Sequence, residues 1–444
     1  MWVVIRGGSI SVGKTTVTLA LMNLFKKVAP FKVGPDFIDP SYHKMITKNH
    51  SYNLDLFLMG EEGVKYSFYN HMKEMNMVEG VMGLYDGMNN SIDNCSTAHL
   101  ARVLNLPVIL IVNGKGRSLS LASEILGYKN FDPNVKIIGV ILNKVHSEER
   151  YHNLKEGIEK YTGIKCLGYL PENSEFSLDS RHLGLIQAHE VEGIKEKIDT
   201  ASKELAKSLD MEYLLKNTIM ENFENEKDKI KNFHSQYNDK YKGIRVGVAK
   251  DDAFTFYYED NLELLEKIGI EIEYFSPIND ETIPDVHMLY FGGGYPENYL
   301  EKLSSNRNMI DSIRSFYKSN KVIYGECGGF IYLSKGVYDI NEKFYPLCGI
   351  ADCEMKMFNR LDISRFGYAD VEFKNRFLGK AHEFHYSRIF NTGEMERSYR
   401  VSKENGKSWI CGYSDKNFLA GYPHLHFFRS MDILEEILKG VDNV

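Results

Sequence analysis

A lysine and a threonine at the end of a glycine-rich loop are the first residues with evident chemistry. Residues 8–15 have the spacing G-x4-G-K-[ST], directly after an apolar run and directly before a helical pattern. In that context the N–H groups of the loop and of the helix N-terminus face phosphate groups together. Lys14 would neutralise the β- and γ-phosphates, and Thr15 would bind Mg²⁺. We predict a nucleotide site built from Gly8, Ser11, Gly13, Lys14, Thr15 and Thr16.

Two pairs of acids follow apolar runs further along the chain. Asp36 and Asp39 lie in KVGPDFIDP, and Glu79 and Asp86 lie in VEGVMGLYDG. Each follows an apolar run, at the carboxyl end of an expected strand, where open α/β sheets bind ligands. One such acid alone is more often a turn residue or a helix cap. Two groups beside a phosphate loop favour Mg²⁺ ligation, because hard cations prefer carboxylate oxygens.

Asn143 ends the apolar run VILNKV. Its side-chain amide can bind the edge of an adenine base, or the residue can simply form a turn. The sequence alone leaves both interpretations open.

Cys327 in GECGGF is the second group with evident chemistry. A buried strand expected at 321–324 ends there and a helical pattern follows, and small neighbours permit the strained elbow that exposes a nucleophile. We expect the helix N-terminus to lower the thiol pKa below its usual value of about 8.5. Gly293 and Gly294 in FGGGYPE are predicted to donate N–H groups to a tetrahedral oxyanion.

The segment YPHLHF offers two candidate bases for this thiol, His424 and His426. Histidines spaced i, i+2 lie on the same side of a strand. A single buried histidine is more often a hydrogen-bonded core residue, but a pair at this spacing favours a functional role. We predict that His424 is the general base and that His426 orients it or lines the site.

The chain around these motifs predicts an α/β protein with two domains. Up to about residue 190, continuous apolar runs alternate with helical patterns, as in a parallel sheet covered on both faces. Residues 196–242 are rich in Lys, Glu and Asn and are expected to form exposed connecting helices. The alternation then restarts. We therefore predict a P-loop domain at 1–195, a charged helical connector at 196–242 and a second α/β domain at 243–444.

Composition excludes several classes of protein. The 444 residues are 43% hydrophobic and 26% charged, with a net charge of −7 and no basic stripe, so a nucleic-acid partner is not expected. The six cysteines include no CxxC pair, so neither a zinc site nor a disulfide framework is expected. No apolar run approaches the ~18 residues of a membrane span. We expect a cytoplasmic protein without a membrane partner.

Several of these motifs together resemble known families. GECGGF, FGGGYPE and the late histidine resemble class I glutamine amidotransferases. FKVGPDFIDPSYH, NLDLFLMG, VEGVMGLYDG and RHLGL resemble the dethiobiotin-synthetase-like ATP domain. Both halves in this order, with HEFHYS and YPHLHF, are similar to the glutamine-hydrolysing corrinoid amidotransferases, among them the cobyrinic acid a,c-diamide synthases.

The resemblance implies a coupled reaction. ATP would phosphorylate a side-chain carboxylate of a corrinoid, and ammonia released from glutamine would displace the phosphate. Carried over, Lys14 and Thr15 would bind nucleotide and metal, with Glu79 and one of Asp36 or Asp39 as further metal ligands and Asp86 positioning metal or substrate. Cys327 would be the nucleophile and His424 its base. Many class I enzymes carry a glutamate two residues after that histidine, whereas this chain has His426, which implies a dyad instead of a triad.

Contacts with the ring carboxylates are also implied by the resemblance. The candidates are Arg181, His182, Arg360, Arg365, His382 and His385. Arginine binds carboxylates with two parallel hydrogen bonds. Each candidate can equally be a surface ion-pair residue or a hydrogen-bonded core residue. The implied partners are glutamine and a tetrapyrrole polycarboxylate, and a homodimer is a further expectation.

Three alternatives remain. The same motifs would serve a,c-diamidation of nickel sirohydrochlorin. Cobyric acid synthase is a second alternative, although the second histidine of YPHLHF argues against it. A partitioning-type P-loop ATPase with a non-catalytic sensor domain is the third, and the intact GECGG motif argues against that class.

Overall fold

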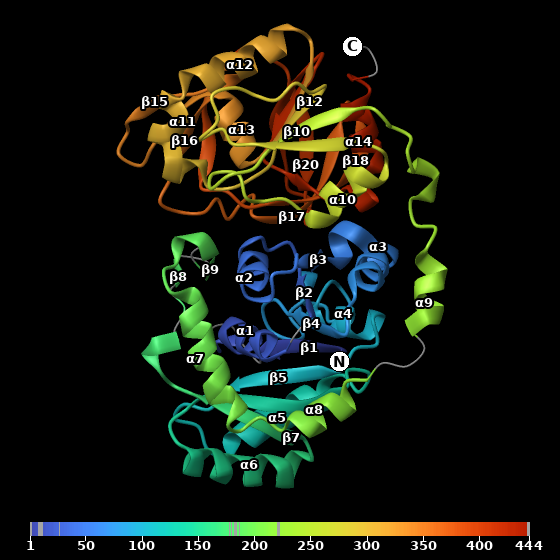
Figure 1. Ribbon diagram of the computed structural model, residues 1–444, viewed down its shortest axis with the longest axis vertical. Helices are drawn as coiled ribbons and strands as arrows, with labels where there is room; N and C mark the ends of the chain where they lie inside the picture. The colour runs from blue at the N-terminus through green and yellow to red at the C-terminus, as the bar shows by residue number, and fades with distance from the viewer. Residues whose placement is uncertain are drawn as a thin grey trace. The chain divides into compact units, whose positions relative to one another are not determined.

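The computed structural model describes residues 2–7, 12–25, 27–176, 178, 180–181, 184–185, 187–219 and 223–441. The chain forms two compact units, one comprising residues up to 56 with 60–233, the other comprising 57–59 with 234–444. Figure 1 shows both units and labels many of their helices and strands.

A seven-stranded sheet organises the first unit. Its strand order is β3-β2-β4-β1-β5-β6-β7, and every neighbouring pair is parallel. Its strands are β1 (Trp2–Gly7), β2 (Val28–Val33), β3 (Tyr52–Leu54), β4 (Met75–Glu79), β5 (Val108–Asn113), β6 (Ile137–Val145) and β7 (Lys165–Pro171). The short strands β8 (Ser180–Arg181) and β9 (Gly184–Leu185) pair separately. The parallel sheet predicted from the continuous apolar runs is confirmed.

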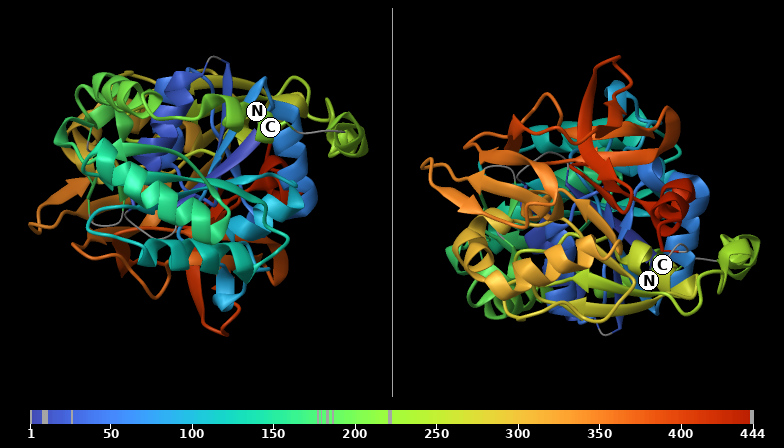
Figure 2. Two further views of the ribbon diagram at one scale, coloured as in Figure 1. Left: turned by 90° about the horizontal axis from the view of Figure 1, so that it is seen from below. Right: turned by 90° about the horizontal axis from the view of Figure 1, so that it is seen from above.

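The first unit also contains helices. They are α1 (Lys14–Leu24), α2 (Ile38–Thr47), α3 (Leu56–His71), α4 (Thr97–Val103), α5 (Ser120–Phe131), α6 (Glu148–Thr162), α7 (Ile194–Ala206), α8 (Met211–Asn217) and α9 (Phe223–Ile230). Helix α3 is interrupted at Gly60, whose φ is 70°. Helices α5 and α6, teal in Figure 2, pack side by side.

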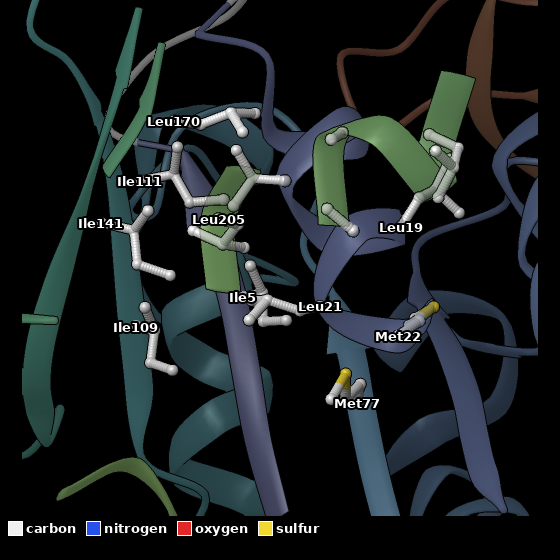
Figure 3. Close-up of a cluster of buried hydrophobic side chains, with 14 of the residues drawn as sticks. Ile5, Leu19, Leu21, Met22, Met77, Ile109, Ile111, Ile141, Leu170 and Leu205 are labelled. Carbon is white, nitrogen blue, oxygen red and sulfur yellow. The ribbon is translucent and has the colours of Figure 1, made fainter. Parts of the chain in front are cut away.

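The main core of the first unit lies between the sheet and helices α1 and α7. Ile5 and Ile109 from the sheet, Leu19 and Leu21 from α1, and Leu205 from α7 belong to one buried cluster (Figure 3). Burial of each such side chain contributes about 1.5–3 kcal/mol relative to exposure. Helix α7 is therefore part of the hydrophobic core.

An exposed connector is expected at 196–242, and the structure differs from it in the first part, α7, whereas residues 224–240 are largely exposed. One face of α7 is apolar and packs on α1, and polar contacts secure the same face: Asn23 Nδ2 donates to Asp199 Oδ1 at 2.8 Å, and Ser202 Oγ donates to Ala20 O at 3.1 Å. The many Lys and Glu residues of α7 suggested exposure, but they occupy only its outer face. The apolar residues at helical spacing indicate a buried face, which the overall composition of the segment does not show.

A ten-stranded mixed sheet organises the second unit. Its order is β11-β10-β12-β13-β22-β21-β20-β17-β18-β23. The first five strands are parallel: β11 (Glu271–Phe275), β10 (Arg245–Ala249), β12 (Met288–Phe291), β13 (Val322–Glu326) and β22 (Phe418–Gly421). The other five pair antiparallel: β21 (Ser408–Asp415), β20 (Arg397–Ser402), β17 (Gly367–Phe373), β18 (Arg376–Glu383) and β23 (His424–Leu425). The predicted α/β class is confirmed, whereas the antiparallel half was not predicted.

A smaller sheet and five helices complete the second unit. The small sheet has the order β15-β14-β16-β19. Its strands are β14 (Ser334–Tyr338), β15 (Phe344–Pro346), β16 (Ala351–Met357) and β19 (Ser387–Thr392). The helices are α10 (Glu259–Lys267), α11 (Leu300–Ser305), α12 (Arg307–Lys318), α13 (Gly328–Leu333) and α14 (Met431–Leu438), with 3₁₀ turns η5 (Pro296–Tyr299) and η6 (Phe427–Arg429). No helix in the described part of the chain has the length and apolarity to cross a membrane.

Helix α7 gives a direct test of the core assignment. Leu205→Ala is expected to lower the free energy of unfolding of the first unit by about 2–5 kcal/mol, because it leaves a cavity between α7 and the sheet. Lys203→Ala, at an exposed position of the same helix, is the control. Urea unfolding of the full chain, followed by circular dichroism, measures the change. Equal midpoints for the two variants would contradict the core role of α7.

Candidate active sites

Parallel pairing brings the chemical groups of the first unit to one edge of its sheet. Strand β4 lies between β1 and β2, with Glu79 paired in register with Ile5 on one side and with Lys32 on the other. Strand β1 ends at this same edge with Gly7, and helix α1 begins at Lys14. The carboxyl ends of adjacent parallel strands meet there, which is where open α/β sheets bind ligands.

Glu79 is the buried centre of this edge. Thr15 Oγ1 donates to its Oε1 at 2.7 Å, and Lys14 Nζ lies 3.9 Å from the same oxygen. His43 Nε2 donates to Oε2 at 2.8 Å, and Nδ1 of that ring lies 2.8 Å from Ser51 Oγ. Burial opposes ionisation of Glu79, but Lys32 and the hydrogen bond from His43 outweigh it and hold the carboxyl pKa well below its ordinary value.

Lys32 is a buried cation that the sequence interpretation missed. Its Nζ forms an ion pair with Asp39 and lies 3.6 Å from Asp36 Oδ2 and 3.5 Å from Glu79 Oε1. Burial disfavours the charged amine, but these three carboxylates together raise the Lys32 pKa. A lysine inside the apolar run APFKVG, with acids four and seven residues later, was the available signal.

The pKa values of the two aspartates beside Lys32 are shifted in opposite directions. Burial, together with the negative charges of Asp36 and Glu79, raises the pKa of Asp39 to about 8. Burial also opposes ionisation of Asp36, but Lys32 and the N–H of Ile38 lower its pKa overall. Asn53 fixes this loop by donating to Gly34 O and Asp36 O, both at 2.8 Å.

The oxygen donors at this edge fit Mg²⁺. Thr15 supplies a hydroxyl and Glu79 a carboxylate, and they lie beside the loop lysine, whereas Asp36 and Asp39 are engaged with Lys32. Among the residues that the structure describes, no group of three or more His, Cys, Asp or Glu side chains forms a protein cage. Mg²⁺ is commonly held by one or two carboxylates plus substrate phosphates and water. Thr15 and Glu79 are therefore the pair best placed to hold it.

Other predicted residues of this site have structural contacts. Asp86 is exposed, and its Oδ2 accepts from Gly83 N at 2.6 Å, which closes a turn. Asn143 Nδ2 donates to Val12 O at 2.7 Å, and Gly13 has a φ of 77° and no room for a Cβ beside that amide. Asn143 thus supports the loop ahead of Lys14, and its contact with adenine stays a prediction.

Several predicted residues lie outside the described part of the chain, wholly or by their side chains. Gly8, Ser11 and His182 are outside it, as is the side chain of Arg181. Thr16 lies in the first turn of α1 and is half-buried.

Cys327 occupies a strained elbow between β13 and α13. Its φ is 46° and its ψ is −101°, a conformation that costs a non-glycine residue of order 1–3 kcal/mol. Cys327 N donates to Gly421 O at 2.8 Å, and Gly329 N donates to Gly292 O at 2.9 Å. A Cβ on Gly328 would lie 2.9 Å from Gly294 N, so the elbow and the triple-glycine loop touch backbone to backbone. Small residues are required here, as predicted from GECGG.

The expected lowering of the thiol pKa is wrong. Burial, and next the negative charge of Glu297, raise the pKa of Cys327 well above its ordinary value, and the Gly328 N–H does not offset them. Helix α13 has only six residues, so its dipole stabilises a thiolate only weakly. The resting group is therefore a thiol that needs a base.

His424, the predicted base, packs against the same glycine loop that touches the elbow. It lies on β23 opposite His382 of β18, and the ring fills the space where Gly293 lacks a side chain. Burial, and then the neighbouring His382 and His385, lower the His424 pKa to about 3. The imidazole is therefore neutral near pH 7 and can accept a proton.

His426 lies in a different environment from His424. Its ring packs against Tyr258 and Phe428, each with a ring-centroid distance of 5.0 Å, and its Nδ1 accepts from Phe428 N at 3.4 Å. Strand β23 ends at Leu425, and His426 caps the following turn η6. Its catalytic role stays a prediction.

The two predicted oxyanion donors are not equivalent. Gly293 N donates to Phe256 O at 3.2 Å in an isolated bridge. Gly294 N is the amide that faces Gly328, the residue after the nucleophile. Of the two glycines, Gly294 is better placed to serve with Gly328, because oxyanion donors flank the nucleophile.

The segment HEFHYS lines the same site. Cys327 Sγ lies 3.6 Å from Phe384 O. His385 stacks on Tyr422 with a centroid distance of 3.7 Å, and its Nε2 lies 3.4 Å from Glu383 Oε2. Of the predicted substrate residues, His385 thus adjoins Phe384, which contacts the nucleophile, and His382 pairs with His424. Their contact with ring carboxylates stays a prediction.

Comparison with known proteins covers both units. Residues 3–186 match the CobQ/CobB/MinD/ParA nucleotide-binding domain, and residues 245–431 match the CobB/CobQ-like glutamine amidotransferase domain.

Curated relatives match the chain over nearly its whole length. The cobyrinate a,c-diamide synthase of Fusobacterium nucleatum is 48% identical, covering 98% of this chain and 99% of the relative. The enzymes of that name from Clostridium acetobutylicum and Caldanaerobacter subterraneus are 42% and 39% identical, each over 98% of this chain and over 99% and 97% of their own lengths.

The buried lysine provides one prediction. Lys32→Met is expected to lower the free energy of unfolding of the first unit by about 3–5 kcal/mol, because the ionised Asp36 and Glu79 lose their buried counter-charge. Lys27→Met is the matched control, since the Lys27–Glu74 pair is exposed and its loss should leave unfolding unchanged. Urea titration of both variants provides the measurement. Similar unfolding curves for both variants would show that Lys32 does not balance the cluster.

Gly293 provides a second prediction. Gly293→Ala is expected to reduce glutamine hydrolysis at least tenfold, because its Cβ would clash with the His424 ring and displace the base. Gly127→Ala is the control, since a Cβ there meets nothing within 4 Å. Glutamate release by the two variants gives the comparison. Full activity of Gly293→Ala would rule out the contact between this loop and the base.

Proposed function

The chain belongs to the family of cobyrinate a,c-diamide synthases, and we propose that it uses ATP and glutamine to convert the a- and c-carboxylates of cobyrinic acid into amides. It is an enzyme of the class that forms carbon–nitrogen bonds. The observation that carries the proposal is the presence in one chain of a phosphate-loop lysine beside Glu79 and a strained cysteine elbow, which touches the glycine loop that packs on His424. A carbon–nitrogen ligase that takes nitrogen from glutamine needs both.

The first unit supports activation of the carboxylate. A carboxylate is a poor electrophile, so one of its oxygens attacks the γ-phosphorus of ATP, the bond to the β-phosphate oxygen breaks, and ADP leaves. Lys14 places a positive charge at the transferring group, and Lys32 balances the carboxylates behind it. Mg²⁺ held by Thr15 and Glu79 would neutralise further phosphate charge.

The second unit supports release of ammonia. The Cys327 thiol passes its proton to His424 while its sulfur attacks the side-chain amide carbon of glutamine, and the amide N–H groups of Gly294 and Gly328 face the developing oxyanion. His424 then protonates the leaving nitrogen, so that ammonia departs and a thioester remains. Water hydrolyses the thioester to glutamate and returns the thiol. Ammonia attacks the acyl phosphate, expels phosphate and leaves the amide.

The substrate can be tested directly. The protein is incubated with ATP, Mg²⁺, glutamine and either cobyrinic acid or nickel sirohydrochlorin, and mass spectrometry follows the macrocycle. We expect cobyrinic acid to gain two amides. Amidation of nickel sirohydrochlorin alone would assign the alternative substrate, and amidation of neither would contradict the proposal. We further propose a cytoplasmic location, where ATP and glutamine are supplied, while a homodimer stays a prediction.

Glutamine hydrolysis and ATP-dependent amidation should be separable, which gives a further prediction. Cys327→Ala is expected to abolish glutamine-dependent amidation, by at least ~10³-fold, because no thioester forms. Amidation with added ammonium chloride at alkaline pH should continue near the wild-type rate, since the first unit is unchanged. Loss of both activities would argue against two independent sites. Cys348→Ala, at another buried cysteine, serves as the control.

A further inference from the structure

A buried glutamate directly precedes the nucleophile. Glu326 is the last residue of β13 and is 2% exposed. A buried carboxylate carries a large desolvation cost, so a compensating role is expected of it. The proposed roles of Cys327 and His424 assign no function to Glu326.

Hydrogen bonds from three neighbours fix this carboxylate. Tyr324 OH donates to Oε1 at 2.6 Å, Tyr290 OH donates to Oε2 at 3.3 Å, and Leu425 N donates to Oε1 at 3.4 Å. These donors come from β13, β12 and β23, so three strands hold the group. All three donors are neutral, so these hydrogen bonds bring no positive charge to the carboxylate.

The carboxylate also faces the base. Glu326 Oε2 lies 3.9 Å from His424 Nδ1, an ion-pair distance that is longer than a hydrogen bond. Catalytic hydrogen bonds are often long without substrate and shorten in the reacting complex. The same carboxylate holds the backbone of Leu425, so it positions both the His424 ring and the strand that carries it.

We propose that Glu326 is the positioning residue of the amidotransferase site, in the place of the glutamate that many class I enzymes carry two residues after the histidine. It holds the tautomer of His424 in which Nδ1 carries the proton and the Nε2 lone pair accepts the Cys327 proton. It then stabilises the imidazolium without taking the proton itself. This inference rests on the proposed glutaminase roles of Cys327 and His424.

His426, the other candidate for this task, has different neighbours. Its ring packs on Tyr258 and Phe428, and its Nδ1 accepts from Phe428 N. Glu326 is the carboxylate that the structure gives at ion-pair distance from His424. The sequence carried the signal, since an acid stands inside a buried strand next to the nucleophile.

Other titratable groups around His424 and Cys327 affect the charge that forms on the His424 ring. His382 and His385 face His424 and disfavour a positive charge on it. Glu297 and Glu383 face Cys327, and Tyr399 adds to the aromatic groups around Glu326. Burial raises the pKa of Glu326 to about 7. A carboxylate at 3.9 Å from Nδ1 can stabilise the imidazolium.

Two substitutions of Glu326 separate positioning from packing. Glu326→Gln keeps the volume and loses the charge, whereas Glu326→Asp keeps the charge and loses volume. We expect Glu326→Gln to reduce the kcat of glutamine hydrolysis on the order of 10²-fold with KM unchanged. We expect Glu326→Asp to retain more activity than Glu326→Gln. Ammonia-dependent amidation should equal that of the wild type in both.

The outcomes distinguish this inference from the proposed function. Wild-type activity in Glu326→Gln, or a greater loss in Glu326→Asp, would overturn the positioning role. A larger kcat loss in His426→Asn would transfer that role to His426. Absence of glutamine hydrolysis in the wild-type protein would instead contradict the proposed function.

A measurement on the wild-type protein covers the case in which the variants do not fold. Nitrogen-15 NMR of histidine-labelled protein, with His424→Gln to assign the ring, reports which ring nitrogen carries the proton. We expect the proton on Nδ1. A proton on Nε2 would exclude the proposed tautomer.

Discussion

A buried charge must be balanced, and both units meet this requirement with a glutamate at the end of a central strand. Glu79 ends β4 beside the phosphate loop, and Glu326 ends β13 beside the nucleophile. Cations and a histidine surround Glu79, and its pKa falls; neutral hydroxyl and amide donors surround Glu326, and its pKa rises to about 7. The same residue type in equivalent positions thus acquires opposite proton affinities from its neighbours.

This difference suits the two chemistries. A site for phosphate and Mg²⁺ needs a carboxylate that is always ionised, and Lys32 keeps Glu79 in that state. In a thiol–imidazole site, a carboxylate is needed as a negative charge when the ring becomes positive. A carboxylate bound by neutral tyrosine hydroxyls can ionise when that happens. In both units the end of a central strand fixes where the glutamate lies, and the neighbouring side chains set its pKa.

The sequence predicted much of the fold, because continuous apolar runs favour buried parallel strands and glycine-rich turns favour tight loops at the strand ends. It predicted the parallel sheet, the elbow at Cys327 and the family, and these are confirmed. It did not predict the antiparallel strands of the second unit, since their pairing depends on contacts between distant segments. It also missed Lys32 and Glu326. The sequence shows each as an ionisable residue in an apolar run, but it does not show the partners from other elements that give the residue its role.

The contact between α1 and α7 joins residues about 180 positions apart, and it has a consequence for how the chain acquires its nucleotide fold. The helix that begins at Lys14 has one apolar face completed by Leu205 and its neighbours, which leave the ribosome long after α1. Until then that face stays open to solvent or to chaperones, because such long-range contacts form late. The folding unit is therefore longer than the 3–186 segment recognised by similarity. A fragment ending at 186 would lack one wall of its own core.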